Sequence, residues 1–180
     1  MRTTTYSPVA KFLHWLVVAL IAVNLAFGWL MPEAKRTVLP SSLNNWHLSF
    51  GIFILAVIAI RFAWRSIVGP PLPEPGPRWQ IVTAEATHLL LYGLVFLLVL
   101  CGWANAVAHD WTITLFGTVT LPPLMPAASW VRDLGDLHEG VVWVLLAAVS
   151  LHVLAALGHH FVLHDNVLRR MLPGHTVERH

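Results

Sequence analysis

Long apolar segments alternate with short polar ones along this chain. Four of the segments hold about 20 or more mostly apolar residues, the length of α-helix that crosses a hydrocarbon core about 30 Å thick. Charged side chains are rare within these segments and gather toward their ends. The pattern predicts four membrane-spanning helices, at about 8–30, 43–67, 79–106 and 135–163.

The composition fits an integral membrane protein. Of the 180 residues, 57% are hydrophobic and 11% are charged, whereas soluble domains carry about 25% charged residues. The first apolar segment is longer than the roughly 7–15 residues of a secretion signal and no cleavage site is evident, so we expect it to remain in the mature chain. We therefore expect an all-α fold, one four-helix bundle over residues 1–180 in a lipid bilayer.

The basic residues predict the orientation of this bundle. Those on one side of the predicted helices are Lys35, Arg36 and Arg132. Those on the other side are Arg2, Lys11, Arg61, Arg65, Arg78, Arg169, Arg170 and Arg179. The positive-inside rule then places both termini in the cytoplasm. The basic residues form no stripe of the kind that binds nucleic acid.

Two connections differ in length and character. Residues 69–78 form a short, proline-rich cytoplasmic link that we expect to be stiff. Residues 107–134 form a longer periplasmic connection that is too apolar for a disordered segment, and we expect it to cap that end of the bundle. The single cysteine, Cys101, lies inside the third predicted helix, which excludes an intrachain disulfide.

Two histidines in the fourth segment, His138 and His152, carry the main chemical signal. They are fourteen residues apart, which is roughly 40° short of four helical turns and about 21 Å along the axis. Both rings therefore face the same way at two depths. Residues 140–157 hold no charged side chain. A polar ring buried in such a segment is costly unless it binds something, so these residues are candidates for function.

Other histidines lie at matching depths. His47, near the start of the second helix, is level with His138 on the periplasmic side, and we expect the two to pair. His14 and His88 lie at similar cytoplasmic depths in the first and third helices. We expect one of these two to pair with His152, and depth alone allows either.

Facing imidazoles on different helices can hold a heme iron from both sides, and this ligation favours electron transfer over oxygen binding. Intramembrane histidines can instead be isolated hydrogen-bonding groups, but several at two matched depths argue against that role. Zinc is disfavoured because no carboxylate or thiolate cluster accompanies the deeper rings. Gly51 and Gly140, close in sequence to His47 and His138, would let a flat macrocycle approach.

Arg61 and Arg65 lie four residues apart at the inner end of the second helix. We expect them to pair with the propionates of an inner heme or to anchor the helix at the lipid headgroups. Their charge and spacing allow both roles.

Several stretches of the chain resemble the bacterial cytochrome b561 family. They are YSPVAKFLHW at the start, NNWHLSFGI opening the second helix, RFAWR closing it, FGTVTLP in the long connection and LHEGVVWVLLAAVSLHVLAALGHHFVLHDNVLRRMLP at the end. The resemblance implies a diheme membrane cytochrome with two stacked b hemes. It implies that His47 and His138 ligate the periplasmic heme, whereas His14 and His152 ligate the cytoplasmic one. His88 would then lie near a propionate or a quinone.

The resemblance also implies an activity. Family members move electrons between the periplasmic face and the membrane quinone pool, so the leading expectation is an enzyme, a superoxide:ubiquinone oxidoreductase (superoxide oxidase). The periplasmic cations Lys35, Arg36 and Arg132 would attract superoxide, although acidic residues surround them in the sequence. The candidates for holding ubiquinone near the inner heme are His159, His160 and Lys11.

Two other functions compete with this one. A cytochrome b subunit would pass electrons between a partner dehydrogenase or hydrogenase and the quinone pool. The short termini and the lack of a large extramembrane domain mildly favour the self-contained enzyme. A non-redox scaffold or transporter would have to explain histidines paired at two depths, and the sequence has no sign of inverted repeats or broken helices.

Overall fold

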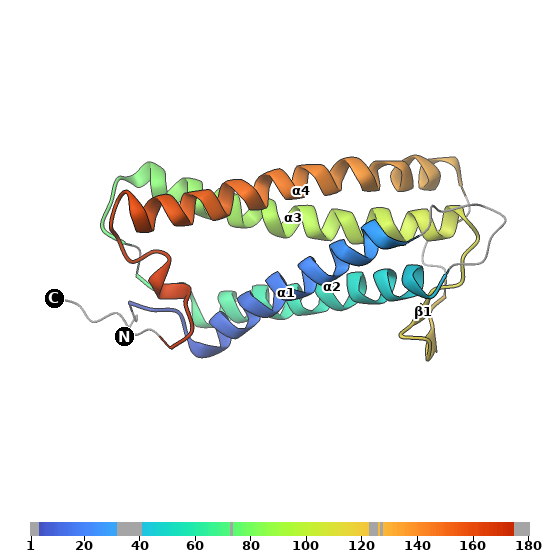
Figure 1. The fold of residues 1–180 in the computed structure, drawn as a ribbon, viewed down its shortest axis with the longest axis horizontal. Coiled ribbons are helices and arrows are strands. Elements are labelled where there is room, and N and C mark those ends of the chain that lie inside the picture. The colour runs from blue at the N-terminus through green and yellow to red at the C-terminus, as the bar shows by residue number, and fades with distance from the viewer. Residues whose placement is uncertain (1–3, 32–40, 73, 123–125, 127, 175–180) are drawn as a thin grey trace.

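The computed structural model describes residues 4–31, 41–72, 74–122, 126 and 128–174. These ranges contain four long helices that run side by side, α1 (Pro8–Leu30), α2 (Ser42–Val68), α3 (Arg78–Ala108) and α4 (Ser129–Phe161) (Figure 1). Each is long and apolar enough to cross a membrane. The predicted all-α bundle of four spanning helices is confirmed.

Local sequence signals set several helix ends. Ser7 caps α1, with its Oγ accepting the Ala10 N–H at 3.3 Å, and Pro8 occupies the first turn, where its missing N–H costs nothing. Ser41 and Asn44 form a capping box at the start of α2. Gly69 ends α2 with a φ of 78°, a conformation that favours glycine.

The helices form two hairpins. α1 packs along α2 and α3 packs along α4, whereas a smaller contact between α2 and α3 joins the hairpins (Figure 1). Residues 4–7 and 162–174 lie at one end of the bundle, which we call the terminal end; the Trp64 indole donates to Ser7 Oγ and the Trp15 indole donates to the Met171 carbonyl there. We call the opposite end the loop end.

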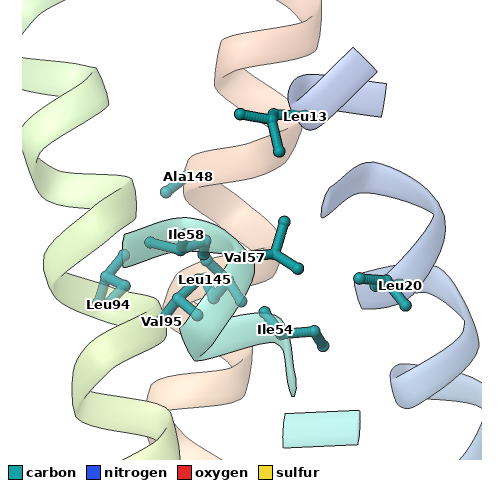
Figure 2. Packing of buried hydrophobic residues seen from close by; sticks show 9 residues of the cluster. All are labelled: Leu13, Leu20, Ile54, Val57, Ile58, Leu94, Val95, Leu145 and Ala148. Carbon is teal, nitrogen blue, oxygen red and sulfur yellow. The ribbon is translucent and has the colours of Figure 1, made fainter. Parts of the chain in front are cut away.

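The buried core occupies the middle of the bundle and takes side chains from all four helices. Its members are Leu13, Leu20, Ile54, Val57, Ile58, Leu94, Val95, Leu145 and Ala148 (Figure 2). Large apolar side chains also cover the outside; Phe12, Leu89 and Leu151 are each about two-thirds exposed, at 65%, 69% and 67%. An apolar exterior of this extent suits lipid rather than water.

The fourth helix starts six residues earlier than the sequence pattern predicts. The expected start at residue 135 left the charged Arg132 and Asp133 outside an apolar span. In the structure both residues belong to the helix and are exposed, whereas Val131 on the same turn is 1% exposed. A Cβ on Gly135 would lie 2.9 Å from the Asn105 Cα, so α3 and α4 approach closely here. The helix therefore extends beyond its apolar segment, and the connection from α3 spans residues 109–128 instead of 107–134.

That connection contains a short antiparallel hairpin, β1 (Thr114–Leu115) and β2 (Val119–Thr120). Its tip rests on the first turns of α2. The Phe116 ring lies 5.6 Å from the Trp46 ring and 5.8 Å from the Phe50 ring, and the Phe116 N–H donates to the buried Ser49 Oγ at 2.9 Å. These contacts hold the hairpin at the loop end, close to His47.

Candidate functional site

Two histidines face each other at the loop end. The ring centroids of His47, on α2, and His138, on α4, lie 6.1 Å apart with an interplanar angle of 81°. The rings come from different hairpins and meet inside the bundle. A metal bonded to each imidazole at about 2 Å would separate the centroids by roughly 6 Å. The structure thus brings together the two residues expected to pair at this level.

Both rings are oriented by backbone carbonyls of the neighbouring helix. His47 Nδ1 lies 3.0 Å from the Asn24 carbonyl oxygen, and His138 Nδ1 lies 3.1 Å from the Leu98 carbonyl oxygen. A carbonyl oxygen only accepts, so each Nδ1 carries the proton and each Nε2 keeps a free lone pair. Histidines that ligate metals are held in this way.

Glycines make room for the two rings. A Cβ on Gly28 would lie 3.2 Å from His47 Cε1, and a Cβ on Gly102 would lie 3.2 Å from His138 Cε1. Each glycine lies four residues after the residue whose carbonyl accepts the histidine Nδ1–H. The two hairpins therefore hold their histidines in the same way. Sequence reasoning missed these glycines because they belong to the partner helix of each histidine. Of the two glycines it chose, Gly140 faces open space, with nothing within 4 Å of an added Cβ.

An apolar pocket adjoins this pair and is lined by both histidines and by side chains from all four helices, as cofactor sites in helix bundles are. Two of its lining residues have buried polar atoms without a hydrogen bond, Asn24 Oδ1 and Trp103 Nε1. Unpaired buried polar groups are rare in native structures and call for a partner. Two facing imidazoles, an apolar pocket and two buried polar atoms without a hydrogen bond fit a heme.

Three histidines meet at the deeper level. The His152 ring, on α4, lies 6.5 Å from the His14 ring of α1 and 5.5 Å from the His88 ring of α3. Both residues considered as partners of His152 are therefore its neighbours. In the described part of the chain no group of three or more His, Cys, Asp or Glu is arranged to hold a metal ion.

Arg61 lies beside this deeper cluster and joins three helices. Its Nε donates to the Tyr92 hydroxyl of α3 at 3.0 Å, and its Nη1 lies 3.5 Å from the Ala10 carbonyl of α1. Arg61 and Arg65 both line one pocket at the terminal end. Among the described residues, neither guanidinium has a carboxylate partner. Two guanidinium groups that line one pocket and lack a carboxylate partner among the described residues fit the propionates of an inner heme.

The residues considered for ubiquinone lie further toward the terminal end. His159 Nδ1 lies 2.5 Å from Asp165 Oδ2, and the His160 ring lies 4.7 Å from the Phe161 ring. Lys11 is buried in the first turn of α1, with 9% of its surface exposed.

The residues considered for attracting superoxide are only partly described. Arg132 is exposed in the first turn of α4, with exposed Asp133 and Asp136 on the same helix. Lys35 and Arg36 lie outside the described residues.

Comparison with known proteins decides the family. Residues 5–174 match the family profile described as Prokaryotic cytochrome b561. This chain belongs to the prokaryotic cytochrome b561 family. It is therefore a multi-pass protein of the bacterial inner membrane, with the electron-transfer role and the b-type heme of that family.

Individual relatives of this cytochrome b561 cover nearly its whole length. It is 30% identical over 171 residues to Cytochrome b561 homolog 2 of Escherichia coli K12, covering 93% of this chain and 90% of the relative. It is 33% identical over 180 residues to the Probable superoxide oxidase CybB of Yersinia pestis, covering 93% and 96%. It is 27% identical over 172 residues to Cytochrome b562 of Cereibacter sphaeroides, covering 93% and 94%.

Proposed function

We propose that this cytochrome b561 is a superoxide oxidase that holds two b hemes and reduces ubiquinone. The observation that carries the proposal is the pair of histidine clusters at two levels of one bundle, with rings from both hairpins in each. The likeness to a relative named as a probable superoxide oxidase supports the choice of substrate.

At the loop-end site, His47 and His138 would hold the heme iron. Heme, when bound, supplies one-electron chemistry. The chain's own contribution is to fix each ring by its Nδ1–H, to keep each Nε2 unprotonated and to exclude water with the apolar side chains of the pocket. Trp103 would donate its indole N–H to a polar edge of the cofactor.

The deeper site would use His152 with His14, and Arg61 with Arg65 would hold the propionates. The choice of His14 rests on the resemblance of its surrounding sequence to the family. The adjacent His88 ring would then border the cofactor.

The distribution of basic residues supports placing the terminal end in the cytoplasm. Superoxide would then give up its electron at the loop end, and ubiquinone would be reduced near the deeper site. The reaction balances as two superoxide anions, one ubiquinone and two protons giving two oxygen molecules and one ubiquinol. The protons would come from the cytoplasmic side.

One experiment separates this enzyme from a cytochrome subunit that needs a partner dehydrogenase or hydrogenase. Purified protein with its hemes is supplied with enzymatically generated superoxide and a soluble ubiquinone, and the heme spectrum and ubiquinol formation are recorded. We expect rapid heme reduction and ubiquinol formation, both abolished by superoxide dismutase. Hemes that stay oxidised under superoxide but are reduced after a partner dehydrogenase is added would support the subunit instead.

A further inference from the structure

The chain turns back sharply just after α4. The Leu163 N–H donates to the Gly158 carbonyl and the Asp165 N–H donates to the His159 carbonyl, each at 3.1 Å, while His164 adopts a φ of 54°. The turn places Asp165 Oδ2 2.5 Å from His159 Nδ1. The other carboxylate oxygen, Oδ1, accepts the Val167 N–H at 3.0 Å. Both oxygens of Asp165 are therefore fixed.

This pairing determines which nitrogen of His159 is chemically available. The carboxylate accepts a hydrogen bond, so Nδ1 carries the proton and Nε2 is left to exchange protons, as in acid–base sites built from a carboxylate and an imidazole. In the described chain Nε2 has no hydrogen-bonding partner. The two side chains are 23% and 25% exposed, so they can exchange protons with water.

His159 also has the right position relative to the deeper histidine cluster. It follows His152 by seven residues on the same helix, so the two rings share a face at about 20° and are about 10 Å apart along the axis. The His159–Asp165 pair contributes to neither histidine cluster. An imidazole held by a fixed carboxylate on this face is suited to proton transfer next to an electron-transfer site.

We propose that His159 and Asp165 form the acid–base site that protonates the quinone. His159 Nε2 gives the protons that accompany the two electrons taken up by ubiquinone, and water at the terminal end reprotonates it. Asp165 stays a carboxylate throughout and acts as a positioning residue. The inference rests on the proposed quinone reduction, and it assigns the proton path of that reaction to named atoms.

The test compares His159→Gln, Asp165→Asn and Asp165→Glu in the full-length heme-loaded protein. We expect ubiquinone reduction to fall about 100-fold in the first two variants, the lower end of general acid–base effects. The fall should be in kcat rather than KM, with a larger solvent deuterium isotope effect, and Asp165→Glu should restore part of the rate. Heme reduction by superoxide should not change.

A second measurement does not depend on activity. In protein labelled with ¹⁵N-histidine, nuclear magnetic resonance should show one strongly deshielded Nδ1 proton, assigned to His159 by its absence from His159→Gln. Asp165→Asn should shift it upfield, because a neutral amide is a weaker acceptor than a carboxylate. A spectrum that does not change in Asp165→Asn would overturn the pairing.

Two control variants separate chemistry from structure. Glu74→Gln weakens the ion pair with Arg170, 2.9 Å long; Arg170 also donates to the Leu72 carbonyl, so these contacts hold the segment after α4 against Leu72 and Glu74. His164→Asn removes the neighbouring exposed imidazole and tolerates the positive φ. Both should reduce ubiquinone normally. If Glu74→Gln reproduces the loss seen in Asp165→Asn, the carboxylate only holds the segment and the proposal is wrong.

The same variants distinguish this inference from the choice of superoxide as donor. Heme reduction by ubiquinol runs the quinone step in reverse and needs no superoxide. If the unchanged protein accepts electrons from ubiquinol but not from superoxide, the proposed substrate is wrong, whereas slow ubiquinol oxidation in Asp165→Asn still supports the acid–base site. An unchanged ubiquinol rate in both His159→Gln and Asp165→Asn would overturn it.

Discussion

His138 Nδ1 lies 3.1 Å from the carbonyl oxygen of Leu98, on the neighbouring helix of its own hairpin. The contact is possible because Gly102, four residues later, has no side chain to collide with the ring. His47 makes the equivalent contact with α1. One local arrangement therefore orients both rings of the loop-end pair, from opposite hairpins, in the way that metal-ligating histidines are oriented.

Replacing Gly102 with alanine should damage the loop-end site alone. The new Cβ would lie 3.2 Å from His138 Cε1 and push the ring off its carbonyl. Loss of such an orienting contact typically weakens metal binding about 10–100-fold. Heme content and the reduced absorption spectrum after purification measure the loss. Gly93→Ala, on the same helix, is the matched control, because Gly93 is exposed and a Cβ there meets none of the described residues within 4 Å; equal heme loss in both variants would contradict the role of Gly102.

Trp103→Phe should lower the midpoint potential of the loop-end heme. Among the described residues the buried Trp103 Nε1 has no hydrogen-bond partner, and a donor to an anionic edge of the cofactor would stabilise the reduced state. Removing a hydrogen bond whose strength differs by about 1 kcal/mol between the two states shifts a one-electron potential by roughly 40 mV. Redox titration measures the shift, and an unchanged potential would show that the indole serves another group.

His14→Ala should remove the deeper heme, whereas His88→Ala should keep both hemes and alter the spectrum of the deeper one. Both rings contact His152, so their proximity to it does not distinguish them. Heme content per chain of the two variants decides between them. Loss of a heme in the His88 variant, with retention in the His14 variant, would reverse the assignment.

Arg61→Gln and Arg65→Gln should each lower the potential of the deeper heme. Both guanidiniums line one pocket and have no carboxylate partner in the described part of the chain, and positive charge next to the propionates favours the reduced state. Arg78→Gln removes the same charge from an exposed site at the same end and should leave the potential unchanged. If the potential changes in neither Arg61→Gln nor Arg65→Gln, the two arginines instead anchor the helix at the lipid headgroups.

The sequence predicted the four helices because lipid sets a minimum apolar length, and helical periodicity placed His138 and His152 on one face. It did not predict features that depend on which helices become neighbours. Gly28 and Gly102 have a role only once the histidine of the adjacent helix packs on them. The sequence pattern missed the early start of α4 because the length of an apolar segment indicates only the part of a helix that lies in lipid. The helix α4 continues beyond that part, through exposed charged residues.

The sequence pattern also did not predict the pairing of His159 with Asp165. The two residues are six apart and would lie on different faces of a continuing helix. Only the turn after Phe161, with its positive φ at His164, brings the carboxylate back onto the ring. His159 was a quinone candidate because it shares a helix face with His152, but its pairing with Asp165 depends on where α4 ends.

The number of hemes per chain tests the central claim most directly. It is measured by pyridine hemochrome assay against protein concentration for the unchanged protein, His138→Ala and His152→Ala. We predict two hemes in the unchanged protein and one in each variant, with different remaining spectra because different sites are lost. Two hemes retained in either variant, or a single heme in the unchanged protein, would contradict the two-level ligation by paired histidines.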